Sequence, residues 1–246
     1  MTSAVDPLTM LDARLRGDPG RPLVTWYDGV SGERVELSAA TTHNWVTKVA
    51  NLLVDDLMLD PGATMSVELG AHWQSVVLTL GAWAAGLTVV RSDLQVSVRV
   101  VGPEAVSRYA DDPQADVLVA SSLRPLGGRF VEPLPASWLD FAVVVPPQPD
   151  LALDPRPMHD PAAVFDGVEY TPGELVEAGN KSAQGAGLAA GGRLVTDHDP
   201  TSAAGLAVAV LGPLAVGGSL VLLAQPDDAL RDAVARQEQP TCTAWR

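Results

Sequence analysis

The sequence predicts an α/β protein with two similar halves, each built from mostly parallel sheet with helices packed against it. Two stretches carry this prediction, Pro61 to Arg91 and Arg193 to Leu223. Each has the pattern of a strand, a helix that is apolar on most sides, a glycine stop and a second apolar strand. Such a unit forms a parallel strand pair with a right-handed crossover. Because a helix without a polar face must be covered all round, we expect both helices to be sandwiched between sheets.

A hairpin followed by a helix precedes each stretch, so the second half echoes the first. Asp28-Gly29 and Asp166-Gly167 are typical of tight turns between two strands. Ser38 is a suitable helix N-cap, and the segment from Thr171 to Glu174 is typical of a capping box. The strands and helices expected around these turns lie at Pro22–Tyr27, Arg34–Leu37, Ala39–Leu57, Ala163–Phe165, Val168–Tyr170 and Thr171–Ala189.

The remaining elements lie before and between the two stretches. We expect a short amphipathic helix at Pro7–Leu15, a strand at Val96–Val101, buried strands at Asp116–Ala120 and Phe141–Val145, and a helix at Glu104–Tyr109. The proline-rich stretch from Pro146 to Pro161 is typical of a boundary. It predicts a first α/β half at residues 1–150 and a shortened second half at residues 151–246.

The composition narrows the classes of function. A formal net charge of −14, with Lys48 and Lys181 as the only lysines, argues against nucleic acid or an anionic membrane as a partner. The single cysteine, Cys242, excludes an internal disulfide framework and a cysteine-based zinc site. No signal-peptide pattern begins the chain, and no apolar stretch reaches the ~20 residues that span a bilayer. We therefore expect a cytoplasmic protein.

Six packing motifs follow one another in a characteristic order along the chain. They are Asp28-Gly29, Val35-Glu36-Leu37, Asn51-Leu52-Leu53, Asp60-Pro61-Gly62, Leu80 to Gly86, and Gly205 to Leu223. This order resembles the N-terminal domain of the adenylate-forming (AMP-binding) superfamily, which includes acyl-CoA synthetases, luciferases and the adenylation domains of peptide synthetases. The chain looks most like shortened relatives from high-GC bacteria. The resemblance implies the fold given above, and AMP or ATP as the possible cofactor.

The residues that would perform the chemistry of this superfamily are largely missing. Its phosphate loop, a Ser/Thr/Gly run ending in Pro-Lys-Gly, should lie just before the helix that starts near Thr171. The chain has AAVFDGVEYTPGEL there, without a glycine run or a lysine. The stretch from Ser121 to Arg129 has the wrong order and the wrong place. The adenine-binding motif, the ribose-binding aspartate and the C-terminal domain with its catalytic lysine would follow Arg246, so we assign no catalytic residue.

If part of a ligand site is retained, we expect it in the loop before the second apolar helix. His198 falls at the C-terminal edge of a strand, where ligands bind open α/β sheets. The related enzymes often place a histidine or an aromatic residue a few positions before the glycine matched by Gly205, and Thr201 and Ser202 stand at those nearer positions. The four candidate ligand residues are thus His198, Thr201, Ser202 and Gly205. The alternative is that they form a solvated loop and a helix cap.

Two other kinds of site are less well supported. Asp197, His198 and Asp199 carry metal-ligating groups, but three adjacent loop residues seldom make a site by themselves, so we expect no metal. The segment from Gly185 to Gly191 has the glycines of a dinucleotide fingerprint without the buried strand that should precede it. We interpret that segment as a helix end and its exit turn.

Three functions remain open. The first is a non-catalytic binding or regulatory protein that keeps the scaffold and a relic acyl or nucleotide pocket. The second is a ligase-type, AMP-dependent synthetase that is completed by a partner chain. The strand edge expected near Thr241–Trp245 would suit such a protein partner, or a homodimer. The third is an interaction module without a pocket.

Overall fold

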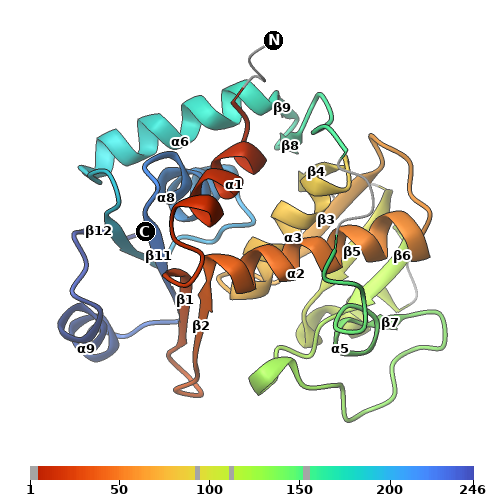
Figure 1. The fold of residues 1–246 in the computed structure, drawn as a ribbon. Coiled ribbons are helices and arrows are strands. Elements are labelled where there is room, and N and C mark those ends of the chain that lie inside the picture. Colours follow the sequence, from red (N-terminus) through yellow and green to blue (C-terminus); the bar gives the residue numbers. More distant parts are fainter. Residues whose placement is uncertain (1–4, 92–94, 111–113, 152–155) are drawn as a thin grey trace. The chain divides into compact units, whose positions relative to one another are not determined.

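The computed structural model describes residues 5–91, 95–110, 114–151 and 156–246 (Figure 1). The chain forms two compact units, and each unit is assembled from separate segments of the chain. The first unit comprises Met1–His43, Gly70–Val76 and Pro172–Arg246, and the second comprises Asn44–Leu69 and Val77–Thr171. This arrangement differs from the expected division into residues 1–150 and 151–246.

The pairing of strands explains why the units are discontinuous. The hairpin that opens the first half joins a sheet with the last apolar strand of the second half, β1 (Pro22–Asp28) beside β11 (Ser219–Ala224). In return, the hairpin that opens the second half joins a sheet with the last strand of the first stretch, β8 (Ala163–Phe165) beside β4 (Thr88–Arg91). Each half therefore begins in one sheet and ends in the other, which a division of the chain into sequential halves cannot represent.

The first unit contains a five-stranded sheet. Its strands, in spatial order, are β12 (Cys242–Ala244), β10 (Arg193–Thr196), β11 (Ser219–Ala224), β1 (Pro22–Asp28) and β2 (Arg34–Ser38). All neighbours are parallel except β1 and β2, which form the expected hairpin. The central strand β11 is buried along nearly its whole length, as an apolar run in a parallel sheet requires.

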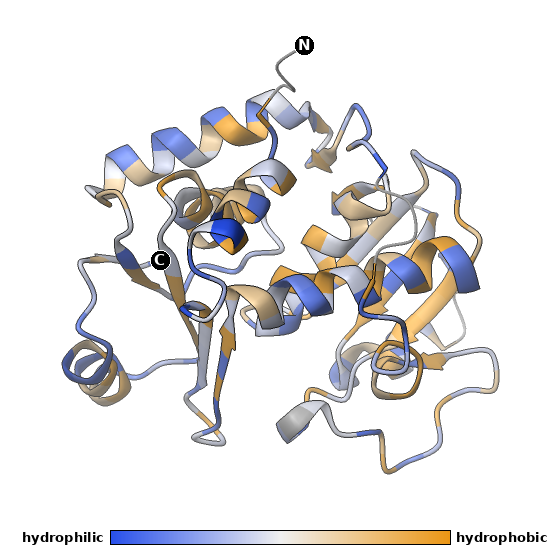
Figure 2. Ribbon diagram, in the orientation of Figure 1, coloured by the Kyte–Doolittle hydropathy of each residue, from blue (hydrophilic) through white to orange (hydrophobic). Residues whose placement is uncertain are grey.

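The second unit contains a seven-stranded sheet. Its strands, in spatial order, are β7 (Leu139–Asp140), β6 (Ala115–Ala120), β5 (Val96–Val101), β3 (Thr64–Glu68), β4 (Thr88–Arg91), β8 (Ala163–Phe165) and β9 (Val168–Tyr170). Only the hairpin pair β8 and β9 is antiparallel. Figure 2 shows the hydrophobic colouring of these strands beside the mixed colouring of the helices.

Most helices lie where the sequence predicts them, with two exceptions. In chain order, the helices are α1 (Pro7–Gly17), α2 (Ala39–Asn51), α3 (Trp73–Ala84), α4 (Val106–Tyr109), α5 (Phe141–Val144), α6 (Pro172–Ala186), α7 (Ala203–Leu206), α8 (Gly212–Ala215) and α9 (Asp228–Glu238). Of these, α5 replaces a predicted strand and α9 was not predicted. Short 3₁₀ turns lie at Pro103–Ala105 and Pro125–Gly127, and α2 continues as a π-helical turn at Leu52–Asp56. Every residue of α3 except Ala84 is buried, in agreement with its lack of a polar face.

The second apolar helix is continuous from α7 to α8, but it contains a π-helical turn at Ala207–Leu211. The N–H of Gly212 donates to the carbonyl of Ala207, five residues back. Pro213 follows directly and has no N–H to donate, so the regular hydrogen-bond ladder is interrupted at this point.

The end of α6 confirms the interpretation of the glycine-rich segment. Gly187 follows the helix with φ +70°, and the N–H of Leu188 donates to the carbonyl of Ala183 at 2.8 Å. These are the features of a glycine C-terminal cap. The segment is a helix end and its exit turn.

The strand predicted at Phe141–Val145 is wrong, because this segment forms the short helix α5. The carboxylate of Asp140 accepts the N–H of Ala142 at 2.9 Å and so caps the helix. Phe141, Val145 and Gln148 are buried while Val143 is exposed, a spacing that suits a helix and not a strand. Phe141 is held by the ring of Trp45, whose centroid lies 5.9 Å away.

Candidate functional site

The four predicted ligand residues lie together after strand β10. We call residues 197–202, between the end of β10 and the start of α7, the β10–α7 loop. Since β10, β11 and β1 are parallel, this loop leaves the first sheet at the edge formed by the carboxyl ends of its strands. That edge is where open α/β sheets bind their ligands.

Most polar groups of the β10–α7 loop bind the loop itself. The carboxylate of Asp199 accepts two hydrogen bonds from Thr201, one from its backbone N–H at 2.8 Å and one from its hydroxyl at 2.7 Å. The hydroxyl of Ser202 donates to the carbonyl of Asp199 at 2.9 Å and accepts the N–H of Gly205 at 3.1 Å, which caps α7. Thr201 and Ser202 therefore hold the loop and begin the helix, as the alternative interpretation predicts.

Gly205 is required by the close approach of the loop to the helix. A Cβ atom at this position would lie 1.8 Å from the carbonyl oxygen of Asp199 and 2.9 Å from Oγ of Ser202. The atom that it would meet first belongs to the backbone, which cannot turn aside as a flexible side chain can. The glycine thus acts in packing.

His198 is the predicted residue whose side chain does not hold the loop. Its backbone N–H donates to Oγ1 of Thr196 at 3.2 Å. Its imidazole is half-buried and makes no hydrogen bond or ion pair with the described part of the chain.

Asp197 is engaged within the first unit. Its carboxylate accepts from Nη2 of Arg231 at 3.0 Å and from the backbone N–H of Arg246 at 2.7 Å. Burial acts to raise the pKa of Asp197, but these two hydrogen bonds outweigh it and lower the pKa overall. Arg231 also lies over the ring of Trp245, 5.4 Å from its centroid. Asp197 is a structural anchor for the segment that follows β12.

The segment expected to hold a phosphate loop forms the tight hairpin of β8 and β9 in the second unit. Asp166 and Gly167 connect the strands with φ values of +51° and +78°. Their left-handed backbone is that of the two-residue turns that join adjacent antiparallel strands. The strands pair directly from Phe165 with Val168 to Ala163 with Tyr170. The two strands are therefore paired up to the two-residue turn.

Sequence reasoning assigned no role to His72, which is a buried histidine of the first unit. Burial lowers the pKa of His72 to about 3, although the nearby carboxylate of Asp28 acts to raise it. Nδ1 accepts the N–H of Gln74 at 3.2 Å, and the ring packs edge-on against Trp26 with centroids 4.3 Å apart. Its burial depends on Trp26, which is far away in sequence, so no local pattern indicates it.

The described residues form neither a metal cluster nor a membrane-spanning helix. No group of three or more His, Cys, Asp or Glu side chains there is placed to hold a metal ion. Over the same ranges, no helix combines the length and the apolar character needed to cross a membrane.

Solved structures define the class of the fold. An acyl-CoA synthetase from Brucella canis matches 99% of this chain with a TM-score of 0.81 and 20% identity. The anthranilate CoA ligase AuaEII, solved with anthranoyl-AMP, matches 98% with a TM-score of 0.75 and 15% identity. The chain spans 47% and 49% of these two structures. The fold is that of the N-terminal part of the acyl-CoA synthetases and ligases, the adenylate-forming class.

A curated relative narrows this class to a family. The "TIGR03089 family protein" of Mycobacterium tuberculosis is 32% identical over 225 residues, which are 90% of this chain and 90% of the relative. This chain belongs to the TIGR03089 family. No family model matches the sequence.

Proposed function

We propose that this chain is a non-catalytic binding or regulatory protein that keeps the adenylate-forming scaffold and a remnant site for AMP or an acyl group. The observation that carries the proposal is the β8–β9 hairpin. The resemblance to the adenylate-forming superfamily places a phosphate loop just before the helix that starts near Thr171, in the segment that forms this hairpin. The chain has the two residues Asp166 and Gly167 there, with both flanking strands paired up to the turn.

Charge supports the same conclusion. Phosphate groups need backbone amides in a concave nest or cationic side chains to offset their charge. The hairpin from Ala163 to Tyr170 contains no lysine or arginine, and it contributes Asp166 and Glu169. The formal net charge of the whole chain is −14. A triphosphate would therefore meet repulsion at this hairpin, whereas AMP or an acyl group would bring less charge or none.

The β10–α7 loop offers the remnant site. His198 has an imidazole without a protein partner among the described residues, and it stands at the carboxyl edge of the first sheet. Thr201, Ser202 and Gly205 hold the loop in place around it. We assign ligand contact to His198 and support of the loop to the other three residues.

The first test is turnover. The purified chain is incubated with ATP and a panel of carboxylic acids (acetate, octanoate, benzoate and anthranilate), and pyrophosphate release and adenylate formation are measured. We expect no product above the protein-free background, with a full-length acyl-CoA ligase as the positive control. Adenylate formed by this chain alone would refute the proposal.

The second test is binding, by thermal unfolding with AMP, a non-hydrolysable acyl-adenylate analogue and acyl-CoA. A ligand present at 100 times its dissociation constant stabilises the folded state by about 2.7 kcal/mol. We expect AMP or the analogue to raise the melting temperature. His198→Ala should abolish the shift. His43→Ala, which changes a partly exposed histidine elsewhere in the first unit, should keep it. If none of the three ligands stabilises the protein, it is a module without this pocket.

A second candidate function is a ligase-type enzyme that a partner chain completes. The edge position of β12 supports it, because an edge strand presents backbone groups that another chain can pair with. In this case ATP-dependent turnover would appear only after a second, co-purifying chain is added. A homodimer through the same edge would instead double the mass in solution without producing turnover.

A further inference from the structure

The second unit contains a cavity of about 390 Å³ that is separate from the β10–α7 loop. It is lined by Pro103, Ser122, Arg124, Phe130, Val131 and Glu132. Pro103 follows the end of β5 and Ser122 follows the end of β6, and these two strands are parallel neighbours. The cavity therefore lies at the carboxyl edge of the second sheet, and its volume suits a small molecule.

The loop that lines this cavity is held in one shape by its own contacts. The hydroxyl of Ser122 donates to the carbonyl of Gly128 and accepts the N–H of Arg124 at 3.2 Å. Leu123, between them, has φ +53°, a left-handed conformation that is unfavourable for a non-glycine residue. The N–H of Phe130 is fixed to the carboxylate of Asp140 at 3.0 Å. These contacts fix the backbone of the loop at Arg124 and Phe130.

The cavity carries two opposite charges that the protein does not pair. The guanidinium of Arg124 and the carboxylate of Glu132 are exposed, and neither makes a hydrogen bond or ion pair with the residues that the structure describes. The ring of Phe130, which is half-buried, and Val131, which is 70% exposed, add apolar surface to the same cavity. An arginine, a glutamate and an aromatic residue thus line the same cavity.

We infer that this cavity binds a zwitterionic small molecule with an apolar side group. Its anionic group binds Arg124, its ammonium group binds Glu132, and its apolar group contacts Phe130 and Val131. A purely anionic ligand would bring its charge close to Glu132, and a purely cationic ligand would bring its charge close to Arg124. Since like charges placed together oppose binding, a ligand with both charges fits better than either. This inference is independent of the proposed AMP or acyl site, which lies in the other unit.

Calorimetry on the whole chain tests the inference with probes that differ only in charge. L-phenylalanine carries both charges, 3-phenylpropionate lacks the ammonium group, and phenethylamine lacks the carboxylate. L-leucine and L-tryptophan extend the series of apolar groups. We expect at least one of the three amino acids to bind, and the two singly charged analogues to bind about tenfold or more weakly than L-phenylalanine where it is the ligand.

Variants then locate the binding. Arg124→Gln and Glu132→Gln should each weaken the binding of the amino acid by about tenfold or more, because each removes one charge-assisted contact. Arg129→Gln, which changes an exposed arginine of the same loop outside the cavity lining, should leave the affinity unchanged. All three side chains are exposed, and circular dichroism confirms that the variants fold. Absence of binding by all three amino acids, binding that both variants leave intact, or equal affinity for 3-phenylpropionate would overturn the inference.

Discussion

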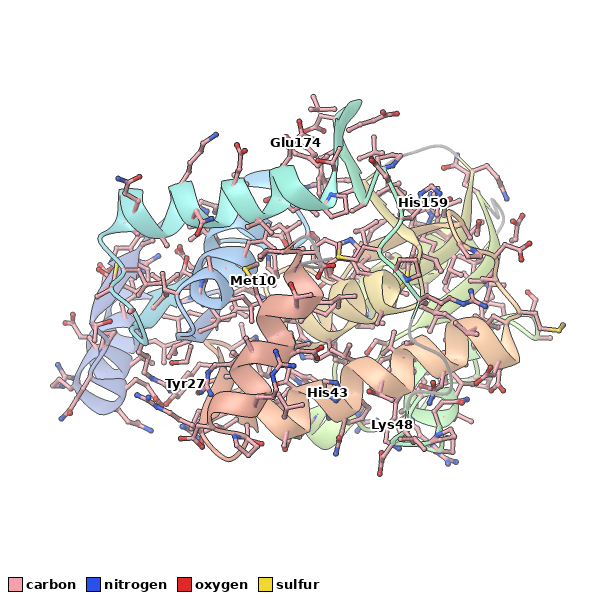
Figure 3. The ribbon with its side chains drawn as sticks, turned by 45° about the horizontal axis from the view of Figure 1, so that its top comes forward. Met10, Tyr27, His43, Lys48, His159 and Glu174 are labelled. Carbon is pink, nitrogen blue, oxygen red and sulfur yellow. The ribbon has the colours of Figure 1, made fainter. Side chains whose placement is uncertain are left out.

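Each unit of the molecule holds a tyrosine whose hydroxyl donates to a glutamate that an arginine also binds. In the first unit, Tyr27 on β1 donates to Glu238 on α9, and Figure 3 labels this tyrosine. Arg34 on β2 donates to the Tyr27 oxygen at 2.8 Å and to Glu238 at 3.0 Å, and its guanidinium lies 5.5 Å from the ring centroid. Arg193 on β10 pairs with the other oxygen of Glu238. We call these residues the Tyr27 cluster.

The second unit repeats this chemistry with a different degree of burial. Tyr109 donates to Glu68 at 2.8 Å, Arg99 pairs with the same glutamate, and the Arg99 guanidinium lies 4.8 Å from the tyrosine ring centroid. We call these residues the Tyr109 cluster. The Arg99 side chain is 0% exposed, whereas that of Arg34 is 36% exposed. The arginine–glutamate contact should therefore contribute differently to stability in the two clusters. Water screens an exposed ion pair, whereas a buried charge is stabilised only by its protein partners.

The largest expected effect tests this difference directly. Arg99→Gln should lower the free energy of unfolding by about 3 kcal/mol. The substitution removes the positive charge that pairs with Glu68, and the smaller glutamine side chain fills the buried space of the guanidinium poorly. Arg34→Gln should lower it by less than about 1 kcal/mol, because Glu238 keeps Arg193 and Tyr27 as partners. Urea unfolding measures both values. Equal losses in the two variants would show that burial does not distinguish the clusters.

A second prediction sharpens the contrast, because the first unit buries a histidine in its neutral form. The pKa of His72 is about 3 in the folded chain and about 6.5 when unfolded. The unfolded state therefore binds a proton first as the pH falls, so stability is full above pH 6.5 and declines below it. Between pH 6.5 and 5 the loss should reach about 2 kcal/mol.

Unfolding by urea at several pH values checks this decline. His72→Gln should remove most of it, and His43→Gln, with a side chain 33% exposed, is the matched control. A decline that persists in the His72 variant would assign it to another group.

The comparison also shows what the sequence could and could not predict. The strand β5 was predicted because its valines form an apolar run, but nothing in that run indicates that Arg99 is completely buried. Alternation would place Arg99 on the face opposite Val98 and Val100, where a polar residue normally meets solvent. In the structure β5 lies between β3 and β6, and Glu68 on β3 meets the arginine. Partners from other strands decide the environment of a charge.

At the candidate site, too, one feature could be predicted from the sequence and another depends on the folded structure. The edge position of the β10–α7 loop follows from a strand followed by an apolar helix, and both were visible in the sequence. The role of Gly205 depends on the fold of the loop, which brings the carbonyl oxygen of Asp199 to within 1.8 Å of the place that a Cβ atom would take. Likewise, the helix α5 was predicted as a strand because five apolar residues in succession, Phe141 to Val145, do not distinguish a strand from a helix. Its cap at Asp140 and the stacking of Phe141 on Trp45 decide it.

The smallest expected difference between the two clusters concerns their tyrosines. Tyr109→Phe and Tyr27→Phe should each lower the free energy of unfolding by about 1 kcal/mol at neutral pH, because each removes one hydrogen bond to a carboxylate and keeps the ring. Burial and then the hydrogen bond to the glutamate raise the pKa of both tyrosines. Their contribution is therefore complete below about pH 10 and is lost as the pH rises further, since the unfolded state gives up its proton first.

Measured from pH 8 to 11, each phenylalanine variant should show a weaker alkaline loss of stability than the unaltered chain. Tyr170→Phe serves as the control, because its ring packs near Phe165 and its hydroxyl belongs to neither cluster. If only Tyr109→Phe flattens the alkaline profile, then Arg34 and Arg193 hold Glu238 in place without the tyrosine. The Tyr27 cluster would then be an ion-pair network in which the phenol is replaceable, and the Tyr109 cluster would be the one that needs all its members.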